Sequence, residues 1–136
     1  MTAIEAATLP VAGLSAWQAL VTEGNLGPGS IVGVAGTGGV SLFVVQIAKM
    51  AGARVVVVGR DAEKLTRVEN MGAETVHSTS DPNWERKVVA TTGGGVDHFV
   101  DVVGGAFLSH AIEATRVGGT VSTMGFVAGS TATIDL

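Results

Sequence analysis

The chain has 136 residues, a net charge of −4 and no cysteine, which excludes a disulfide framework and a thiolate metal site. It has no lysine or arginine cluster for nucleic acid, and its apolar runs stay below the roughly 18 residues of a membrane span. Its length suits one domain with a core of its own, and the amino end lacks the layout of a signal peptide. We therefore expect a cytoplasmic protein with neither a nucleic-acid nor a membrane partner.

The first 29 residues are predicted to form an approach segment of helices. Residues 3–23 divide into two helical pieces at Pro10, and Gly24 is placed to end the second piece. Residues 26–29 are typical of a turn that leads into a strand. The second piece is expected to carry its apolar side chains on one face, at Leu14, Trp17, Leu20 and Val21.

The stretch from Ser30 to Ser41 is the most informative part of the chain. A β-branched run ends in a glycine cluster, and a segment with the period of a buried helix face follows at once. Strand, glycine turn and helix start together hold the pyrophosphate of a dinucleotide, because free N–H groups and the positive end of the helix dipole meet the anion. Gly36 would allow the sharp turn, and Gly38 the close approach of the phosphates. Ser41 stands where the usual G-x-G-x-x-G pattern has its third glycine.

Strands and helices alternate through the remainder. The predicted strands are residues 30–35, 54–58, 74–77, 96–103 and 120–124. The predicted helices run from the glycine turn to about residue 51, from the cap Asp61 to Gly72, from Asp81 to Gly93, and over 107–115. This alternation predicts a doubly wound parallel sheet in three α/β/α layers, within one domain at residues 30–136. Right-handed crossovers give the strand order 3-2-1-4-5.

Several short motifs occur in a fixed order, and together they resemble the medium-chain dehydrogenase/reductase superfamily. The likeness is greatest to its zinc-type alcohol dehydrogenase and quinone oxidoreductase-like branch, where the Ser41 variant also occurs. It covers nearly the whole chain and implies a Rossmann-type NAD(P)-binding domain. The segments that carry it are Ala6–Trp17, Gly36–Ser41, Ala51–Ala53, Glu63–Leu65, Met71–Ala73, Gly95–Asp97 and Val117–Gly119.

The resemblance also implies parts that the chain lacks. Family members have an amino-terminal lobe that holds the substrate and, in many, a catalytic zinc, and their cofactor domain has one more strand. We therefore expect a fragment of a longer enzyme that transfers hydride between nicotinamide and an alcohol, an aldehyde or ketone, or a quinone. The fragment alone would be inactive, with its last strand missing and homodimer formation open.

Cofactor choice is expected to depend on the end of the second strand. NAD-binding sheets place an acidic residue there to bind the ribose 2′-hydroxyl. The resemblance puts Gly59 at that position, so NADP(H) is preferred and NAD(H) stays possible. Arg60 and Lys64 are positioned for a 2′-phosphate, whereas Asp61 either caps a helix or, one register away, binds the ribose. Ser78 stands where some NADP-type members have a tyrosine.

The predicted cofactor contacts come from the glycine turn and from the ends of the second, fourth and fifth strands. They are Gly36, Thr37, Gly38, Gly39, Val40, Gly59, Arg60, Lys64, Val102, Val103, Gly104, Gly125 and Phe126.

No catalytic or metal-binding residue is predicted. Asp97 and Asp101 lie roughly 13 Å apart along one strand, too far to share a proton. His77, His98 and His110 fall on different elements without ligand spacing. Two other functions stay open: an S-adenosylmethionine-dependent methyltransferase, which usually has an acidic residue closing the second strand, and a non-enzymatic NAD-sensing module.

Overall fold

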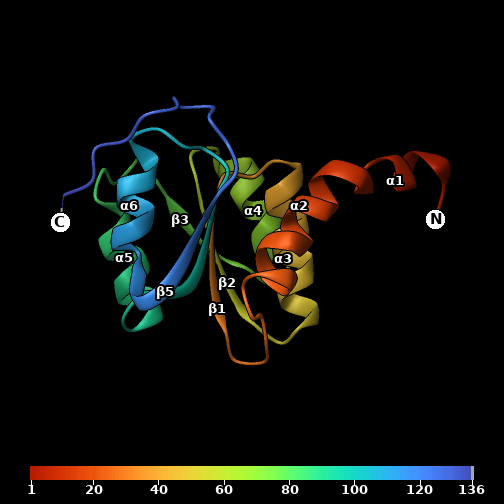
Figure 1. The fold of residues 1–136 in the computed structure, drawn as a ribbon, viewed down its shortest axis with the longest axis horizontal. Helices are drawn as coiled ribbons and strands as arrows, with labels where there is room; N and C mark the ends of the chain where they lie inside the picture. Colours follow the sequence, from red (N-terminus) through yellow and green to blue (C-terminus); the bar gives the residue numbers. More distant parts are fainter. Residues whose placement is uncertain (136) are drawn as a thin grey trace.

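The computed structural model describes residues 1–135 and shows a five-stranded sheet between two layers of helices (Figure 1). Its order, β3-β2-β1-β4-β5, confirms the predicted order and the three-layer α/β fold. Every neighbouring pair of strands is parallel. The strands are β1 (Ile31–Ala35), β2 (Arg54–Gly59), β3 (Glu74–His77), β4 (Val96–Asp101) and β5 (Thr115–Thr123).

Two groups of helices cover the two faces of the sheet (Figure 1). One face is covered by the approach segment, α3 (Gly39–Met50) and α4 (Ala62–Asn70), and the other by α5 (Trp84–Thr92) and α6 (Phe107–Glu113). No helix within residues 1–135 is both long enough and apolar enough to cross a membrane. The approach segment consists of α1 (Ala3–Ala7), the π-helical turn η1 (Leu9–Gly13), α2 (Leu14–Trp17) and the π-helical turn η2 (Gln18–Thr22).

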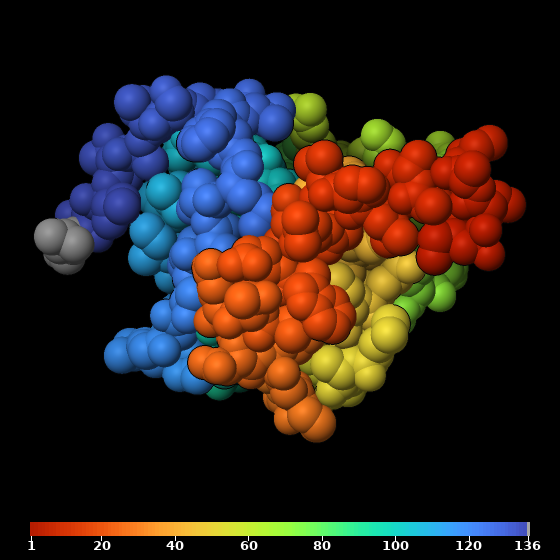
Figure 2. Space-filling model, turned by 45° about the vertical axis from the view of Figure 1, so that its right-hand side comes forward, coloured from red at the N-terminus to blue at the C-terminus, as the bar shows by residue number. Residues whose placement is uncertain are grey.

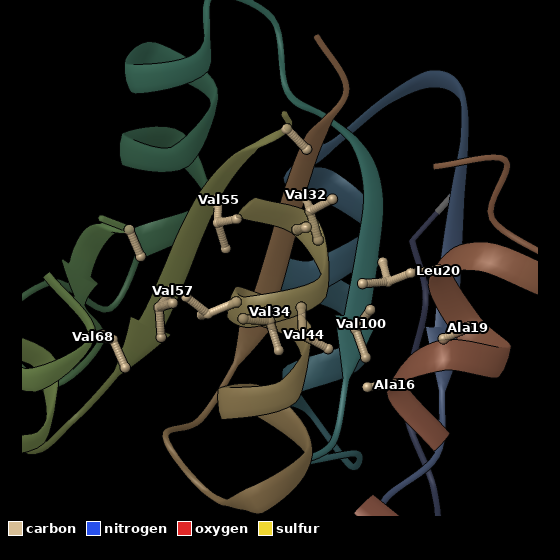
Figure 3. Packing of buried hydrophobic residues seen from close by; sticks show 14 of the residues in the cluster. Ala16, Ala19, Leu20, Val32, Val34, Val44, Val55, Val57, Val68 and Val100 are labelled. Carbon is tan, nitrogen blue, oxygen red and sulfur yellow. The ribbon is translucent and has the colours of Figure 1, made fainter. Parts of the chain in front are cut away.

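Strand β2 shows why the sheet is covered on both sides. Its Val55 and Val57 belong to the cluster under α3 and α4, whereas Val56 and Val58 belong to the cluster under α5 and α6. Successive strand residues point to opposite faces, so a run of valines is apolar on both. Such a strand suits the middle of a parallel sheet, where helices shield each side. Figure 3 shows the first cluster, in which strand valines pack against α3, α4 and the approach segment.

The approach segment buries a different face from the predicted one. Of the four residues expected to share a face, Leu20 is fully buried, but Leu14, Trp17 and Val21 are exposed, Trp17 by 51%. The alanines of the segment, Ala16 and Ala19, pack closely against the first cluster (Figure 3). Of the four residues predicted to share a face, only Leu20 therefore belongs to the core.

Three element boundaries also differ from the prediction. The break in the approach segment falls at Thr8, and Pro10 lies in the first turn of the second piece, where its missing N–H is tolerated. Strand β4 ends two residues early, at Asp101, because its carboxylate accepts hydrogen bonds from the following turn. Strand β5 begins at Thr115 instead of residue 120, and its pairing with β4 is irregular just after Val96.

Helix α5 starts later than the sequence indicates. The predicted opening at Asp81 is a turn, in which the Asp81 carboxylate accepts a hydrogen bond from the N–H of Asn83, and the helix begins at Trp84. Trp84 is buried and stacks on Phe107 of α6 with ring centroids 4.5 Å apart. This contact joins the two helices on their face of the sheet.

Asp97 connects β1, β4 and β5. Its carboxylate accepts hydrogen bonds from the N–H of Ile31 at 2.7 Å and from the guanidinium of Arg116. Burial raises the pKa of Asp97, but these hydrogen bonds and the charge of Arg116 outweigh it, so the pKa lies below its ordinary value of 3.8. The fold therefore favours the charged carboxylate.

We expect Asp97→Asn to lower the free energy of unfolding at neutral pH by about 1 kcal/mol or less, since Arg116 is half exposed and water screens the pair. A carboxyl whose pKa is lowered by folding stabilises the fold above its unfolded pKa and loses that contribution as the pH falls through the folded value. The difference between wild type and variant should therefore be present at neutral pH and shrink at a pH well below the ordinary value of 3.8. Urea titrations at both pH values measure it, and a difference independent of pH would contradict the prediction.

Candidate functional site

The glycine turn joins the carboxyl end of β1 to the start of α3. Gly36 has a φ of +84°, a conformation that favours glycine, and its N–H donates to the carbonyl of Val58 at 2.7 Å. A Cβ at Gly36 would lie 3.5 Å from a methyl group of Val102. The turn thus contacts the ends of both strands that flank β1.

Gly38 occupies the N-cap of α3 in an extended conformation, with φ −86° and ψ −171°. No side chain among the described residues caps this helix, and a Cβ at Gly38 would meet no atom within 4 Å. The first N–H groups of a helix have no partner inside it, so they are available to a ligand. An anion fits this open, uncapped helix start.

Ser41 belongs to the fold and not to the open side of the turn. It is fully buried, and its hydroxyl donates to the carbonyl of Ala35 at 3.0 Å. This bond fastens the first turn of α3 to the end of β1. It explains how serine replaces the third glycine of the usual pattern, because the added oxygen finds an acceptor in the strand.

Gly59 lies at the carboxyl end of β2, directly beside the glycine turn. A Cβ there would be 2.9 Å from Leu65 of α4 and 3.3 Å from Thr37. Position 59 therefore has no room for a carboxylate unless Leu65 moves. Arg60 and Lys64 are exposed, and neither forms an ion pair within residues 1–135.

Asp61 caps α4. Its Oδ1 accepts a hydrogen bond from the N–H of Lys64 at 3.1 Å. This hydrogen bond agrees with the capping role expected for Asp61. It also occupies one of the two carboxylate oxygens to which a ribose hydroxyl could donate. The side chain of Lys64 stays exposed above this cap.

The ends of β4 and β5 meet next to the glycine turn. Oδ1 of Asp101 accepts hydrogen bonds from the N–H groups of Val103 at 2.9 Å and Gly104 at 3.0 Å. A Cβ at Gly125 would lie only 1.9 Å from the carbonyl oxygen of Val102, so the two segments touch through their backbones. Phe126 stands apart from this contact, with its side chain 69% exposed.

The predicted contacts thus come from one edge of the sheet. The glycine turn touches the ends of β2 and β4, and the end of β5 lies on β4. Carboxyl ends of parallel strands are where open α/β sheets bind ligands, next to the point where the strand order reverses. In this sheet that point lies between β1 and β4.

A polar pair between β4 and β5 was missed by the sequence analysis. Nε2 of His98 and the hydroxyl of Ser122 lie 2.8 Å apart. Burial lowers the pKa of His98, and the backbone of Gly24 and the charge of Glu23 only partly oppose it, so the neutral imidazole is favoured. No sequence signal indicates this pair, since its members are 24 residues apart.

A groove of about 450 Å³ lies between the approach segment and β5, and none of the predicted cofactor contacts lines it. Figure 2 shows the approach segment, in red and orange, beside the blue strand on this face. Within residues 1–135, no three His, Asp or Glu side chains come together in a way that could hold a metal ion.

Known proteins match the chain along most of its length. The family model described as zinc-binding dehydrogenase matches residues 39–136. A zinc-type alcohol dehydrogenase-like protein of Schizosaccharomyces pombe is 38% identical over 136 residues, which cover 97% of this chain and 39% of that protein.

Two solved structures share the fold. An NAD-dependent alcohol dehydrogenase superposes with a TM-score of 0.84 at 38% identity, covering 93% of this chain and 37% of that one. A mycobacterial protein complexed with NADPH superposes with a TM-score of 0.89 at 28% identity, covering 99% and 42%. The chain therefore spans about two fifths of the length of these relatives.

Proposed function

The chain belongs to the zinc-binding dehydrogenase family, as its resemblance to medium-chain dehydrogenases/reductases implied, and we propose that it is the NADP(H)-binding domain of a hydride-transfer enzyme. Residues 1–29 would be the approach helices and residues 30–136 the cofactor domain. Zinc and substrate would be held by polypeptide outside this chain, because the relatives extend well beyond it. The bound nicotinamide would supply the hydride chemistry, on an alcohol, a carbonyl compound or a quinone.

One observation carries the proposal: the open, uncapped start of α3 at Gly38. Two neighbouring phosphates could lie against the N–H groups of this turn without displacing a side chain. Gly36 keeps the turn tight, while Val102, Val103 and Gly104 would border the nicotinamide half.

Preference for NADP(H) is supported by the end of β2. The relatives include both an NAD-dependent enzyme and a protein complexed with NADPH, so the family alone leaves the choice open. In this chain, a carboxylate at position 59 would require Leu65 to move, and Arg60 follows with no ion-pair partner within residues 1–135. A free guanidinium at this place suits a 2′-phosphate.

Thermal unfolding with added ligands tests the proposal. NADPH at about 100 times its Kd should raise the Tm by about 10 °C, because a ligand that binds only the folded state stabilises it by about 2.7 kcal/mol at that concentration. NADH should raise the Tm less at equal concentration, and S-adenosylmethionine not at all. A shift with S-adenosylmethionine alone would favour the methyltransferase alternative.

The same preparation should not reduce aldehydes or quinones with NADPH, since the proposal places substrate and zinc on polypeptide outside this chain and no three His, Asp or Glu side chains within residues 1–135 could hold a metal ion. A fall in the absorbance of NADPH would measure the reaction. Sustained turnover by the purified chain would show that it is a complete enzyme.

A further inference from the structure

His77 lies at the same edge of the sheet as the proposed cofactor site but belongs to no interaction yet described. It is the last residue of β3 and pairs in register with Gly59, the last residue of β2. The N–H of Ser78 donates to the carbonyl of Gly59 at 2.9 Å, so the two strands stay side by side up to their ends.

The side chain of His77 points toward the α4 face of the sheet. Val76 is buried in the cluster under α5, and successive strand residues point to opposite faces. Thr75, two residues before His77, donates its hydroxyl to Glu69 of α4, which confirms that these alternate residues face that helix. Two residues of a strand span about 6.6 Å, which is a little more than the rise of one helical turn. His77 therefore lies level with the first turns of α4, and it is half-buried.

Charged groups of both signs surround this position, and the acidic ones accept hydrogen bonds or form an ion pair. Arg60 follows β2, and Lys64 stands on the first turn of α4, while Asp61 is engaged in capping that helix. Glu63 forms an ion pair with Arg67 at 2.6 Å, so its charge is already balanced. Two more acidic groups lie nearby: Glu69 of α4 accepts a hydrogen bond from the hydroxyl of Thr75, and Asp81 accepts a backbone hydrogen bond in the next turn.

We propose that His77 is a third ligand of the adenosine 2′-phosphate, together with Arg60 and Lys64, so that the preference for NADPH strengthens in weak acid. This inference rests on the proposed function, because it assigns one more residue to that site. The imidazole would donate a hydrogen bond to the phosphate in its neutral form and add a charge in its protonated form. Histidine is the side chain type whose charge changes between about pH 5 and about pH 8.

Fluorescence titrations with NADPH and NADH at about pH 5.5 and about pH 8 test the inference. The 2′-phosphate itself titrates near pH 6, so wild type must be compared with His77→Gln at each pH. We expect His77→Gln to weaken NADPH about fivefold at the lower pH and less than about twofold at the higher one. NADH should bind both proteins equally, which shows that the variant is folded.

His77→Lys provides a second variant with a permanent charge. This variant should bind NADPH at about pH 8 at least as tightly as wild type does at about pH 5.5. The comparison is corrected for the titration of the 2′-phosphate, which is measured as the change in NADPH affinity of His77→Gln between the two pH values. Equal NADPH affinity of wild type and His77→Gln at both pH values would overturn the inference and leave the proposed function standing. Binding of neither dinucleotide by wild type would overturn both.

Discussion

Gly38→Val should weaken NADPH and NADH binding by at least about 100-fold while the protein stays folded. Hydrogen bonds to charged groups contribute about 1.5–3 kcal/mol each, and a valine over the start of α3 would displace the phosphates from at least two N–H groups. The substitution should cost little stability. Gly38 has an extended backbone that valine adopts readily, and its Cβ would meet no atom within 4 Å.

Gly27→Val is the matched control for this experiment. Gly27 also has open space around a Cβ and does not require a positive φ, but it lies in the turn before β1, at the opposite edge of the sheet. It should bind both dinucleotides like wild type. Isothermal titration calorimetry measures the affinities, and circular dichroism checks the fold of each variant. Unchanged binding by Gly38→Val would place the cofactor elsewhere.

The sheet could be predicted from the sequence because its signals are local. The all-valine run of β2 indicates a strand covered on both faces, and short glycine-bounded helices between such strands allow only right-handed crossovers. The glycine turn and the cap at Asp61 follow from the same kind of local pattern.

The errors arose where distant residues decide the structure. The early start of β5 depends on pairing with β4 at Val96, and Thr115 reads as helical until that partner is known. The carboxylate of Asp97 contacts residues that lie 66 and 19 positions away in the chain. Hydrophobic periodicity does not indicate contacts between such distant residues. For the approach segment, periodicity identified a helix but not which side of it would meet the sheet.

The candidate site divides in the same way. Local pattern located Gly36 and Gly38, and the structure adds the reason for each: a positive φ for the first and an open helix start for the second. The close approach of Leu65 to Gly59 could not be inferred, because it depends on how α4 packs across the end of β2.

Arg60→Ala should weaken NADPH about tenfold and leave NADH almost unchanged, since NADH has no 2′-phosphate to lose. A hydrogen bond to a charged group contributes about 1.5–3 kcal/mol, and the exposure of Arg60 puts the effect at the lower end of that range. Raising the salt concentration should narrow the gap between the two cofactors in wild type, because ions screen an exposed pair.

Lys49→Ala is the control, because Lys49 is also exposed and forms no ion pair within residues 1–135, but it lies in the last turn of α3, away from the glycine turn. It should bind both cofactors like wild type. Fluorescence titrations of the three proteins at low and high salt measure these differences. If wild type prefers NADH, or if Arg60→Ala weakens both cofactors equally, Arg60 does not bind the 2′-phosphate. The free oxygen of the capping carboxylate at Asp61 then becomes the better candidate for the ribose, with Asp61→Asn as the variant that decides it.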